Sequence, residues 1–392
     1  MLRNSTDQLD PVTVEELTAW RKDIHMHPEL AFEETRTAEF VANKLKEFGL
    51  EVHQGLAKTG VVGTLRCGTS DRAIGLRADL DALPLQEENT FDHKSKIDGK
   101  MHACGHDGHT IMLLGAAQEM AKNRNFDGTV HFIFQPAEEN FGGGEVMVKE
   151  GLFDLFPMSH VYGMHNMPAL PAGTFAMRSG PTMAAHDRFD ITITGVGGHG
   201  ARPNESIDPV VVASQVVVAL QSIVSRNTDP QQAAVISTTM INGGHTYNVI
   251  PEKVTLGGGV RSFTKETQEL IKRRMFEVVK GVCEAYGATY DLNYEYGYPM
   301  VVNTDDGVEA AAAAATTVAG DANVRTDMPP VMGSEDFAFM LQEKPGAYIF
   351  IGNGTGEDIC MIHNPGYDFN DSILETGVRY WQTLAEQQLP VS

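Results

Sequence analysis

Met101-His102-Ala103-Cys104-Gly105-His106-Asp107-Gly108-His109, residues 101–109, is the stretch that decides the fold. It brings imidazole rings, a thiol and a carboxylic acid together within one short segment. Its glycines allow the backbone to turn tightly, so that these side chains can converge. The apolar run at residues 111–117 follows directly and predicts a buried helix whose first turn carries the polar cluster.

The side chains of this stretch also indicate a chemistry. Cysteine and histidine together are ligands of borderline metals such as zinc, and they are not typical ligands of magnesium or calcium. For this stretch alone, the alternative is a polar loop that caps a helix and contains scattered histidines. The choice depends on which other donors the chain brings to the same place.

Acidic residues follow two of the predicted strands. The strand at 73–77 leads into Asp79 and Asp81, and the buried strand at 128–135 leads into Glu138 and Glu139. In open α/β sheets, sites form at such strand ends. Neighbours on an extended chain point to opposite sides, so one glutamate can bind a metal while the other acts as a base. Solvated strand ends and a plain acidic turn are the alternatives.

Further histidines come from other parts of the chain. A short strand near 161–166 delivers His165, and the loop after the strand at 347–352 carries His363. We expect structural roles for His25 and His27, in a loop that ends the first helix before Pro28. The strand ends and loops together deliver more donors than one metal needs, namely Asp79, Cys104, His106, Glu138, Glu139, His165 and His363. This predicts a pair of metal ions about 3.5–4 Å apart.

The chain changes character after Ser179-Gly180-Pro181. Residues 187–296 predict the order strand, helix, strand, strand, helix, strand, which is that of a ferredoxin-like sandwich. We therefore expect an inserted domain at 184–297, within a catalytic domain formed by 1–183 and 298–392. Helices are expected at about 13–24, 35–48, 209–226, 267–286, 307–319 and 371–388.

Composition limits the classes of partner. The formal net charge of -22 argues against nucleic acid and anionic membranes, because both require basic patches. The four cysteines are too few and too widely spaced for a disulfide framework. The N-terminal residues are polar, without a cleavage signal, and no run approaches the length of a membrane span. We expect a cytoplasmic protein.

The motifs together resemble those of the M20 metallopeptidase family. More closely, the chain resembles its amidohydrolase branch, which holds hippurate hydrolases, N-acyl-amino-acid amidohydrolases and plant auxin-conjugate hydrolases. The motifs that carry the resemblance are Arg77-Ala-Asp-Leu-Asp-Ala-Leu-Pro84, His102-Ala-Cys-Gly-His-Asp-Gly-His109, Gln135-Pro-Ala-Glu-Glu139, Gly197-Gly-His-Gly-Ala201 and Gly333-Ser-Glu-Asp-Phe337. They span nearly the whole chain. The resemblance implies an α/β, zinc-peptidase-like catalytic domain with a mixed central sheet flanked by helices, and an inserted ferredoxin-like lid and dimerisation domain.

The resemblance also implies a metal site. Its ligands would be Cys104, His106, Glu139, His165 and His363, holding two divalent ions: zinc, manganese, cobalt or nickel. Cys104 stands where other M20 branches use a bridging aspartate, and Arg77 stands where they carry a metal-binding histidine. Asp79 would orient a ligand imidazole. Glu138 would be the general acid and base.

Substrate contacts are implied for the inserted domain. His199 would stabilise the oxyanion from the partner subunit, which requires a homodimer or a tetramer. Asn248 and Arg261 would hold the carboxylate of the substrate, with Gly333 also in contact with it. The alternatives are a loop histidine for His199, a turn residue for Asn248 and a surface ion pair for Arg261.

The implied activity is hydrolysis of the amide bond of N-acyl or N-aroyl amino acids. A dipeptidase or an N-carbamoyl-amino-acid hydrolase of the same family is the alternative among enzymes. A non-catalytic metal-binding protein that keeps the fold is the alternative outside enzymes. The presence of Glu138 favours an enzyme.

Overall fold

The chain forms two compact units in the computed structural model, which describes residues 8–356 and 360–391. The large unit comprises Met1–Thr182, Val302–Pro329 and Asp336–Ser392, and the small unit comprises Met183–Val301 and Pro330–Glu335. We expected the chain to change domain at 183/184 and 297/298. The segment 330–335, which we placed in the catalytic domain, groups with the small unit.

Backbone hydrogen bonds explain that difference. The Ala184 N–H lies 3.2 Å from the Val331 carbonyl and 2.9 Å from the Gly333 carbonyl. Met183 and Val331 also form a parallel bridge. The segment is therefore attached to the residues with which the small unit begins.

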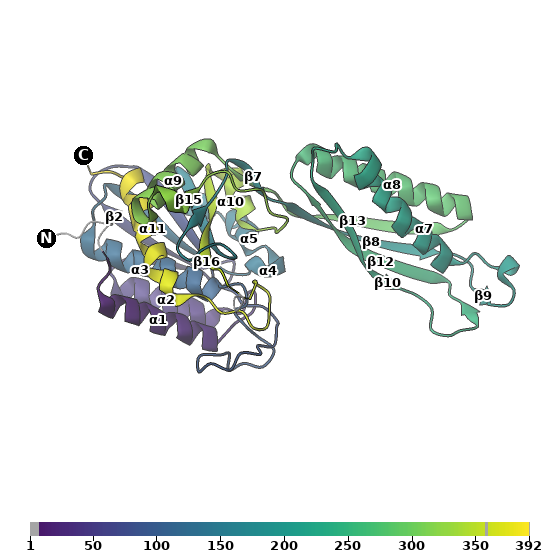
Figure 1. Cartoon of the computed structure of the whole chain (residues 1–392), viewed down its shortest axis with the longest axis horizontal. Helices are drawn as coiled ribbons and strands as arrows, with labels where there is room; N and C mark the ends of the chain where they lie inside the picture. The colour runs from purple at the N-terminus through teal and green to yellow at the C-terminus, as the bar shows by residue number, and fades with distance from the viewer. Residues whose placement is uncertain (1–7, 357–359, 392) are drawn as a thin grey trace. The chain divides into compact units, whose positions relative to one another are not determined.

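An eight-stranded mixed sheet forms the centre of the large unit (Figure 1). Its strands lie in the order β1 (Glu51–Leu56), β2 (Gly60–Cys67), β4 (Gly128–Gln135), β3 (Ala73–Asp79), β5 (His160–Pro168), β16 (Gly346–Gly354), β6 (Phe175–Ala176) and β15 (Val324–Arg325). Strands β4, β3, β5 and β16 run parallel, so their carboxyl ends meet at one edge. Strands β4 and β16 are buried along their whole length, as is typical of central strands covered on both faces.

Helices cover this sheet. The longer ones are α1 (Pro11–Met26), α2 (Thr35–Glu47), α3 (His106–Asn123), α9 (Asp305–Ala319) and α11 (Leu374–Gln388). The short ones are α4 (Glu138–Phe141), α5 (Gly143–Lys149), α6 (Leu152–Leu155), α10 (Phe337–Glu343), η3 (Asp321–Asn323) and η4 (Asp371–Ile373). Helix α3 is buried from His106 to Met120, which confirms the buried helix expected after the polar cluster. Helix α1 extends beyond its predicted end, so His25 lies in a helix and not in a loop.

The small unit is a four-stranded antiparallel sheet with two helices. Its strands lie in the order β10 (Ala234–Asn242), β12 (Lys253–Ser262), β8 (Ala185–Thr194) and β13 (Thr289–Tyr298). Helices α7 (Pro209–Ser222), continued by η2 (Ile223–Asn227), and α8 (Lys265–Tyr286) share an apolar core with this sheet. The order of elements confirms the predicted ferredoxin-like arrangement. Shorter elements are β9 (Gly198–His199), η1 (Pro203–Glu205) and β11 (Val249–Ile250), and β7 (Gly180–Met183) pairs with β14 (Val301–Asn303).

One segment, Pro209–Asn227 of α7 and η2, is long and apolar enough to cross a membrane by length and composition. This differs from our expectation that no run approaches that length. The helix buries Val212, Val216 and Leu220 in the core of the small unit. Length and composition alone are weak evidence for a membrane span, because a helix that packs on a core passes the same test.

Candidate metal centre

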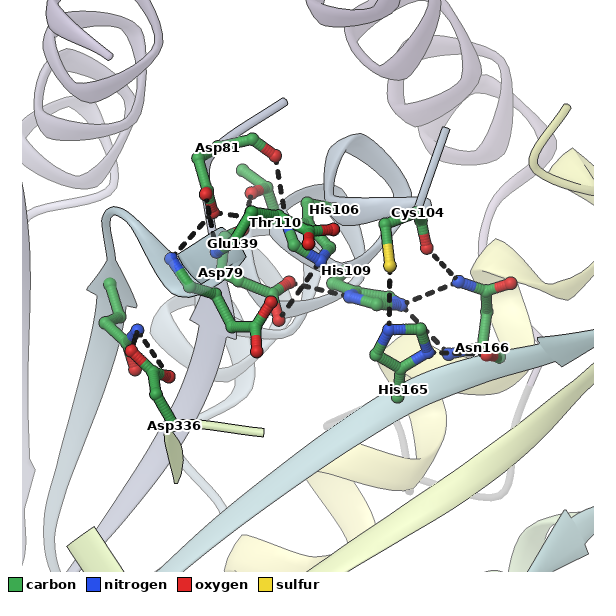
Figure 2. A network of polar contacts seen from close by, with 12 residues as sticks. Asp79, Asp81, Cys104, His106, His109, Thr110, Glu139, His165, Asn166 and Asp336 are labelled. Atoms are coloured by element: carbon green, nitrogen blue, oxygen red, sulfur yellow. Dashed lines mark hydrogen bonds and ion pairs between the residues drawn. The ribbon is translucent and has the colours of Figure 1, made fainter. Parts of the chain in front are cut away.

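The large unit gathers the predicted donors at the carboxyl edge of its parallel strands (Figure 2). Cys104 and His106 lie just before and at the start of α3, and His165 lies near the end of β5. The ligand atoms of these three residues lie within 4.8 Å of one another. The atoms of Cys104, Glu139 and His363 meet the same limit, as do those of His106, Glu138 and Glu139. Shared members join these groups into one cluster.

Gly105 makes the turn between Cys104 and α3 possible. Its φ is +89°, in the left-handed region that favours glycine. A Cβ atom at this position would collide with the side-chain nitrogen of Asn166 and the hydroxyl of Tyr367. The glycine therefore allows Cys104 and His106 to face the same space.

Backbone carbonyls fix which nitrogen each of two histidines presents. The Nδ1 atom of His165 lies 2.6 Å from the Asn166 carbonyl, and the Nδ1 atom of His106 lies 2.9 Å from the Asp81 carbonyl. A carbonyl oxygen only accepts, so both Nδ1 atoms carry a proton, and each ring offers a lone pair on Nε2 once that nitrogen is deprotonated, as metal binding requires. His165 Nε2 is 3.3 Å from Cys104 Sγ. His106 Nε2 is buried and makes no hydrogen bond to any described residue.

The electrostatics of the cluster suit a cation. Burial, followed by the charges of Glu139 and Glu138, raises the pKa of the Cys104 thiol well above its usual value. Burial would lower the pKa of His106, but the charges of Asp79 and Asp81 outweigh it and raise this pKa to about 10. A thiolate beside two carboxylates requires positive charge nearby. A soft thiolate, imidazole nitrogens and a carboxylate are a donor set that fits zinc and related divalent ions.

Glu139 and His363 complete the set. His363 Nε2 is 3.1 Å from Glu139 Oε1. The His363 backbone N–H donates to the Ala103 carbonyl at 2.7 Å, so the loop that carries it is tied to the segment before Cys104. All five predicted ligands thus lie together, although they come from four separate segments of the sequence.

Asp79 lies between two imidazole rings. We predicted that it orients a ligand imidazole. Its Oδ1 accepts a hydrogen bond from His109 Nδ1 at 2.7 Å, and its Oδ2 is 3.7 Å from Nε2 of the predicted ligand His106. His109 Nε2 then accepts the backbone N–H of Asn166 at 2.9 Å. Both ring nitrogens of His109 are occupied, so this histidine of the cluster has a structural role.

Arg77 is one of three cationic neighbours that lower the pKa of Asp79. Its Nη1 donates to Asp79 Oδ2 at 2.7 Å, and its Nη2 donates to Asp336 at 2.9 Å. Burial alone would raise the pKa of Asp79, but the charges of His106, His109 and Arg77 hold it well below the usual value. Arg77 therefore anchors a buried ion-pair network beneath the cluster.

His25 has the structural role that we predicted, although in a helix. Its two ring nitrogens lie 2.8 Å from Asp107 and 3.3 Å from Glu87. Burial opposes its positive charge, but the hydrogen bonds to these carboxylates raise its pKa to about 9. His27 is held by the Asp23 carbonyl at 2.7 Å.

Two predicted substrate residues of the small unit are adjacent. Val249 pairs with His199 across β11 and β9, and the Gly200 N–H donates to the Asn248 carbonyl at 2.8 Å. His199 Nδ1 accepts the Ala201 N–H at 3.1 Å. In the neutral ring the proton is therefore on Nε2, which is exposed as a donor. Asn248 also makes a turn contact, with Oδ1 3.2 Å from Thr246 Oγ1.

Arg261 lies on the face of the small sheet that carries no helix. It lines a pocket of about 480 Å³ with His186 and Arg188, and its Nη1 is buried without a described partner. Burial and the charge of Arg188 lower its pKa. The carbonyl of Gly333 accepts a hydrogen bond from the Ala184 N–H at 2.9 Å.

Sequence reasoning missed the roles of Asp81, His109 and Asn166. Asp81 receives the backbone N–H groups of Glu138 at 3.1 Å and of Glu139 at 2.9 Å. Asn166 donates to the Cys104 carbonyl at 2.7 Å. The available signal was the pair of acids in Asp79-Leu-Asp81, but their backbone partners cannot be read from the sequence.

The chain is similar to proteins of a peptidase family and to several hydrolases. A family model described as "Peptidase family M20/M25/M40" matches residues 75–387. A hippurate hydrolase of Campylobacter jejuni is 44% identical over 369 residues, covering 94% of this chain and 95% of its own. An N-acetylcysteine deacetylase of Bacillus subtilis is 39% identical over 368 residues, covering 93% of this chain and 94% of its own.

A solved structure from B. subtilis, the YXEP protein, is described as a dinuclear metal-binding peptidase of the M20 family. It is 34% identical to this chain, with a TM-score of 0.84 over 97% of this chain and 99% of its own. A putative aminohydrolase of methicillin-resistant Staphylococcus aureus has a TM-score of 0.89 at 32% identity, over 96% of this chain and 97% of its own.

Proposed function

Because the chain belongs to peptidase family M20/M25/M40, we propose that it is a metal-dependent amidohydrolase of N-acyl and N-aroyl amino acids, including hippurate. Its products would be a carboxylic acid and a free amino acid. The observation that carries the proposal is the buried cluster in which Cys104, His106 and His165 converge beside Glu138 and Glu139.

The ligands in this proposal are Cys104, His106, Glu139, His165 and His363. Divalent ions held there would polarise the amide carbonyl and make a water molecule more acidic. The relative that is described as dinuclear supports two ions per subunit. Zinc, manganese, cobalt and nickel all suit a donor set that includes a thiolate.

Glu138 moves the proton. It follows β4 directly and lies beside the ligand Glu139, within reach of the same cluster. We assign it the removal of a proton from the attacking water and the return of that proton to the leaving amine. Glu138 is only 7% exposed, so its carboxylate is shielded from bulk solvent.

We assign to His199 the stabilisation of the oxyanion in the active site of the partner subunit of a homodimer. Its Nε2–H is the kind of donor that a developing oxyanion requires. Arg261 and Asn248, with Gly333, are assigned to the carboxylate of the amino acid. Arg261 Nη1 has no hydrogen-bond partner among the described residues, so it can form a charge-assisted hydrogen bond to the substrate carboxylate.

A substrate panel with metal analysis tests the proposal. The purified protein is assayed on hippurate, simple dipeptides and N-carbamoyl amino acids, before and after treatment with a chelator. We expect hippurate to be hydrolysed best, activity to disappear with the metal, and activity to return when metal is added back. Preference for dipeptides or carbamoyl compounds would replace the substrate assignment, and bound metal without any turnover would indicate a non-catalytic protein.

A further inference from the structure

We infer that Asp81 is a positioning residue that fixes the ligand His106 and the Glu138–Glu139 pair relative to each other. The inference rests on the proposed metal-dependent function, but it concerns a residue that we did not assign to the site. Asp81 lies two residues after the end of β3, and it is 1% exposed.

The Asp81 carboxylate holds the turn that carries both glutamates. Its Oδ1 accepts the Glu138 N–H at 3.1 Å, and its Oδ2 accepts the Glu139 N–H at 2.9 Å (Figure 2). These N–H groups begin α4, where the first backbone donors have no partner within the helix. Because each oxygen takes one N–H, the carboxylate fixes the direction in which the first turn points.

The same residue holds His106. The His106 Nδ1 atom is 2.9 Å from the Asp81 carbonyl and 3.3 Å from Asp81 Oδ1. This contact places the proton on Nδ1 and directs the lone pair of Nε2 into the cluster. Asp81 therefore contacts the ring of the proposed ligand His106, and it also contacts the backbone of the proposed ligand Glu139 and of the proposed base Glu138.

An amide cannot replace this carboxylate. In Asp81→Asn, one of the two oxygens becomes an NH₂ group, which would face a backbone N–H of Glu138 or Glu139. The turn must then shift, although the shape of the side chain is almost unchanged. The variant should fold, yet it should bind metal in a distorted site.

The chain offers a matched control in Asp127→Asn. Asp127 Oδ1 also accepts two consecutive backbone N–H groups, those of Thr69 at 2.7 Å and Ser70 at 2.8 Å, in a turn of the same unit. Asp127, Thr69 and Ser70 are not part of the candidate metal cluster. In Asp127→Asn the amide oxygen can keep both of these hydrogen bonds, whereas Asp81→Asn must lose one. This control therefore reports the general effect of removing a carboxylate charge from a turn of the same unit.

The test is cobalt binding to the metal-free full-length protein, followed through the visible spectrum of cobalt and by competition with a chelator. We expect Asp81→Asn to bind cobalt about 10–100-fold more weakly, as loss of a contact behind a ligand typically does, and to have an altered spectrum. Asp127→Asn should behave as the wild type in both measurements.

Wild-type affinity and spectrum in Asp81→Asn would overturn the inference, as would an equal change in Asp127→Asn. If Asp81→Asn does not fold, Asp81→Ser, which keeps one acceptor in less volume, takes its place with the same expectations. A wild-type protein that binds no cobalt would contradict the proposed function itself, so the two failures are distinguishable.

Discussion

At the scale of residues, neighbouring hydrogen bonds decide which side chains of the cluster can bind a metal. His106 and His165 present Nε2 because backbone carbonyls occupy their Nδ1 atoms, whereas both nitrogens of His109 are occupied by Asp79 and Asn166. Residue type alone does not distinguish these three histidines. The difference lies in their hydrogen-bond partners.

Replacing Glu138 tests the assignment of the base. We expect Glu138→Gln to lower turnover by about 10²–10⁴-fold, because the amide cannot take a proton, while metal content and folding are unchanged. Glu145→Gln is the control, since Glu145 is partly exposed and pairs with Lys149 within α5. Steady-state kinetics and metal analysis are the measurements. Near-normal turnover in Glu138→Gln would exclude it as the base.

Replacing Cys104 tests the ligand set. We expect Cys104→Ser to lose metal more readily during dialysis against a chelator, because a hydroxyl is a far poorer ligand than a thiolate. Cys283→Ser is the control. Cys283 is also buried, but in the core of the small unit, so its loss should affect stability and not metal content. Unchanged metal retention in Cys104→Ser would count against the thiolate as a ligand.

At the scale of elements, two tight turns bring the donors to the sheet edge. One is the turn at Gly105 before α3, and the other is the turn at Ala137 before α4, where φ is +56°. The second is held by Glu34, the N-cap residue of α2, whose Oε1 accepts the Ala137 N–H at 2.9 Å. Each turn can be perturbed by one substitution.

The turn before α3 is tested by comparing two glycines. Gly105 and Gly99 both have a positive φ, of +89° and +73°, but a Cβ atom at Gly99 would meet nothing within 4 Å. Alanine should cost about 1–2 kcal/mol at Gly99 through backbone conformation alone. Gly105→Ala should cost more and also weaken metal binding, because Asn166 must move. Equal losses of stability with equal metal affinity would contradict this account.

The turn before α4 predicts a dependence on pH. Burial, with a smaller contribution from the charge of Asp81, raises the pKa of Glu34 from 4.5 to about 7. The folded state therefore binds this proton more tightly than the unfolded state, and stability falls as pH rises from about 4.5 to about 7. A difference of one in pKa between the two states corresponds to about 1.4 kcal/mol, so the free energy of unfolding falls by up to a few kcal/mol.

Glu34→Gln should remove this fall. The amide can accept the Ala137 N–H and donate to the Thr59 hydroxyl, so both contacts are retained. Urea unfolding of the metal-free protein at pH 5 and pH 8 should show the variant gaining stability over the wild type as pH rises. Glu33→Gln, at an exposed neighbour, is the control. A constant difference between variant and wild type would disprove the raised pKa.

At the scale of the whole molecule, the sequence predicted the long buried elements and missed the small ones. Strands β4 and β16 and helix α3 were recognised from their apolar runs, because an element that is buried on all sides consists mainly of apolar residues. Strand β1 was missed, because Glu51–Leu56 is largely exposed and its polar residues do not alternate with apolar ones as in a half-buried strand. The two-residue strands β6 and β15 depend on pairing across the sheet, which no local pattern records.

The site was predictable to a similar degree. The participation of residues with distinctive chemistry in the cluster, such as Cys104 and His106, could be predicted from type and spacing. The role of Asp81 could not, because it depends on backbone groups of Glu138 and Glu139 that are remote in the sequence.

The proposed dimer is tested by mixing two inactive variants. Glu138→Ala and His199→Ala should complement each other after subunit exchange, because a mixed dimer contains one site with both wild-type residues. Random mixing in equal amounts should restore activity to about a quarter of wild type, as roughly half of the dimers are mixed. If mass measurements verify exchange and no activity returns, His199 does not act in the partner's site.

The order of the ligands along the chain has a consequence for biosynthesis. Cys104, His106, Glu139 and His165 all precede the small unit, whereas His363 follows it. During translation, the ribosome must therefore produce the whole inserted domain before the last donor exists. With the ligand set that we propose, a nascent chain can offer only part of the coordination sphere, so we expect full metal loading after the small unit has been synthesised.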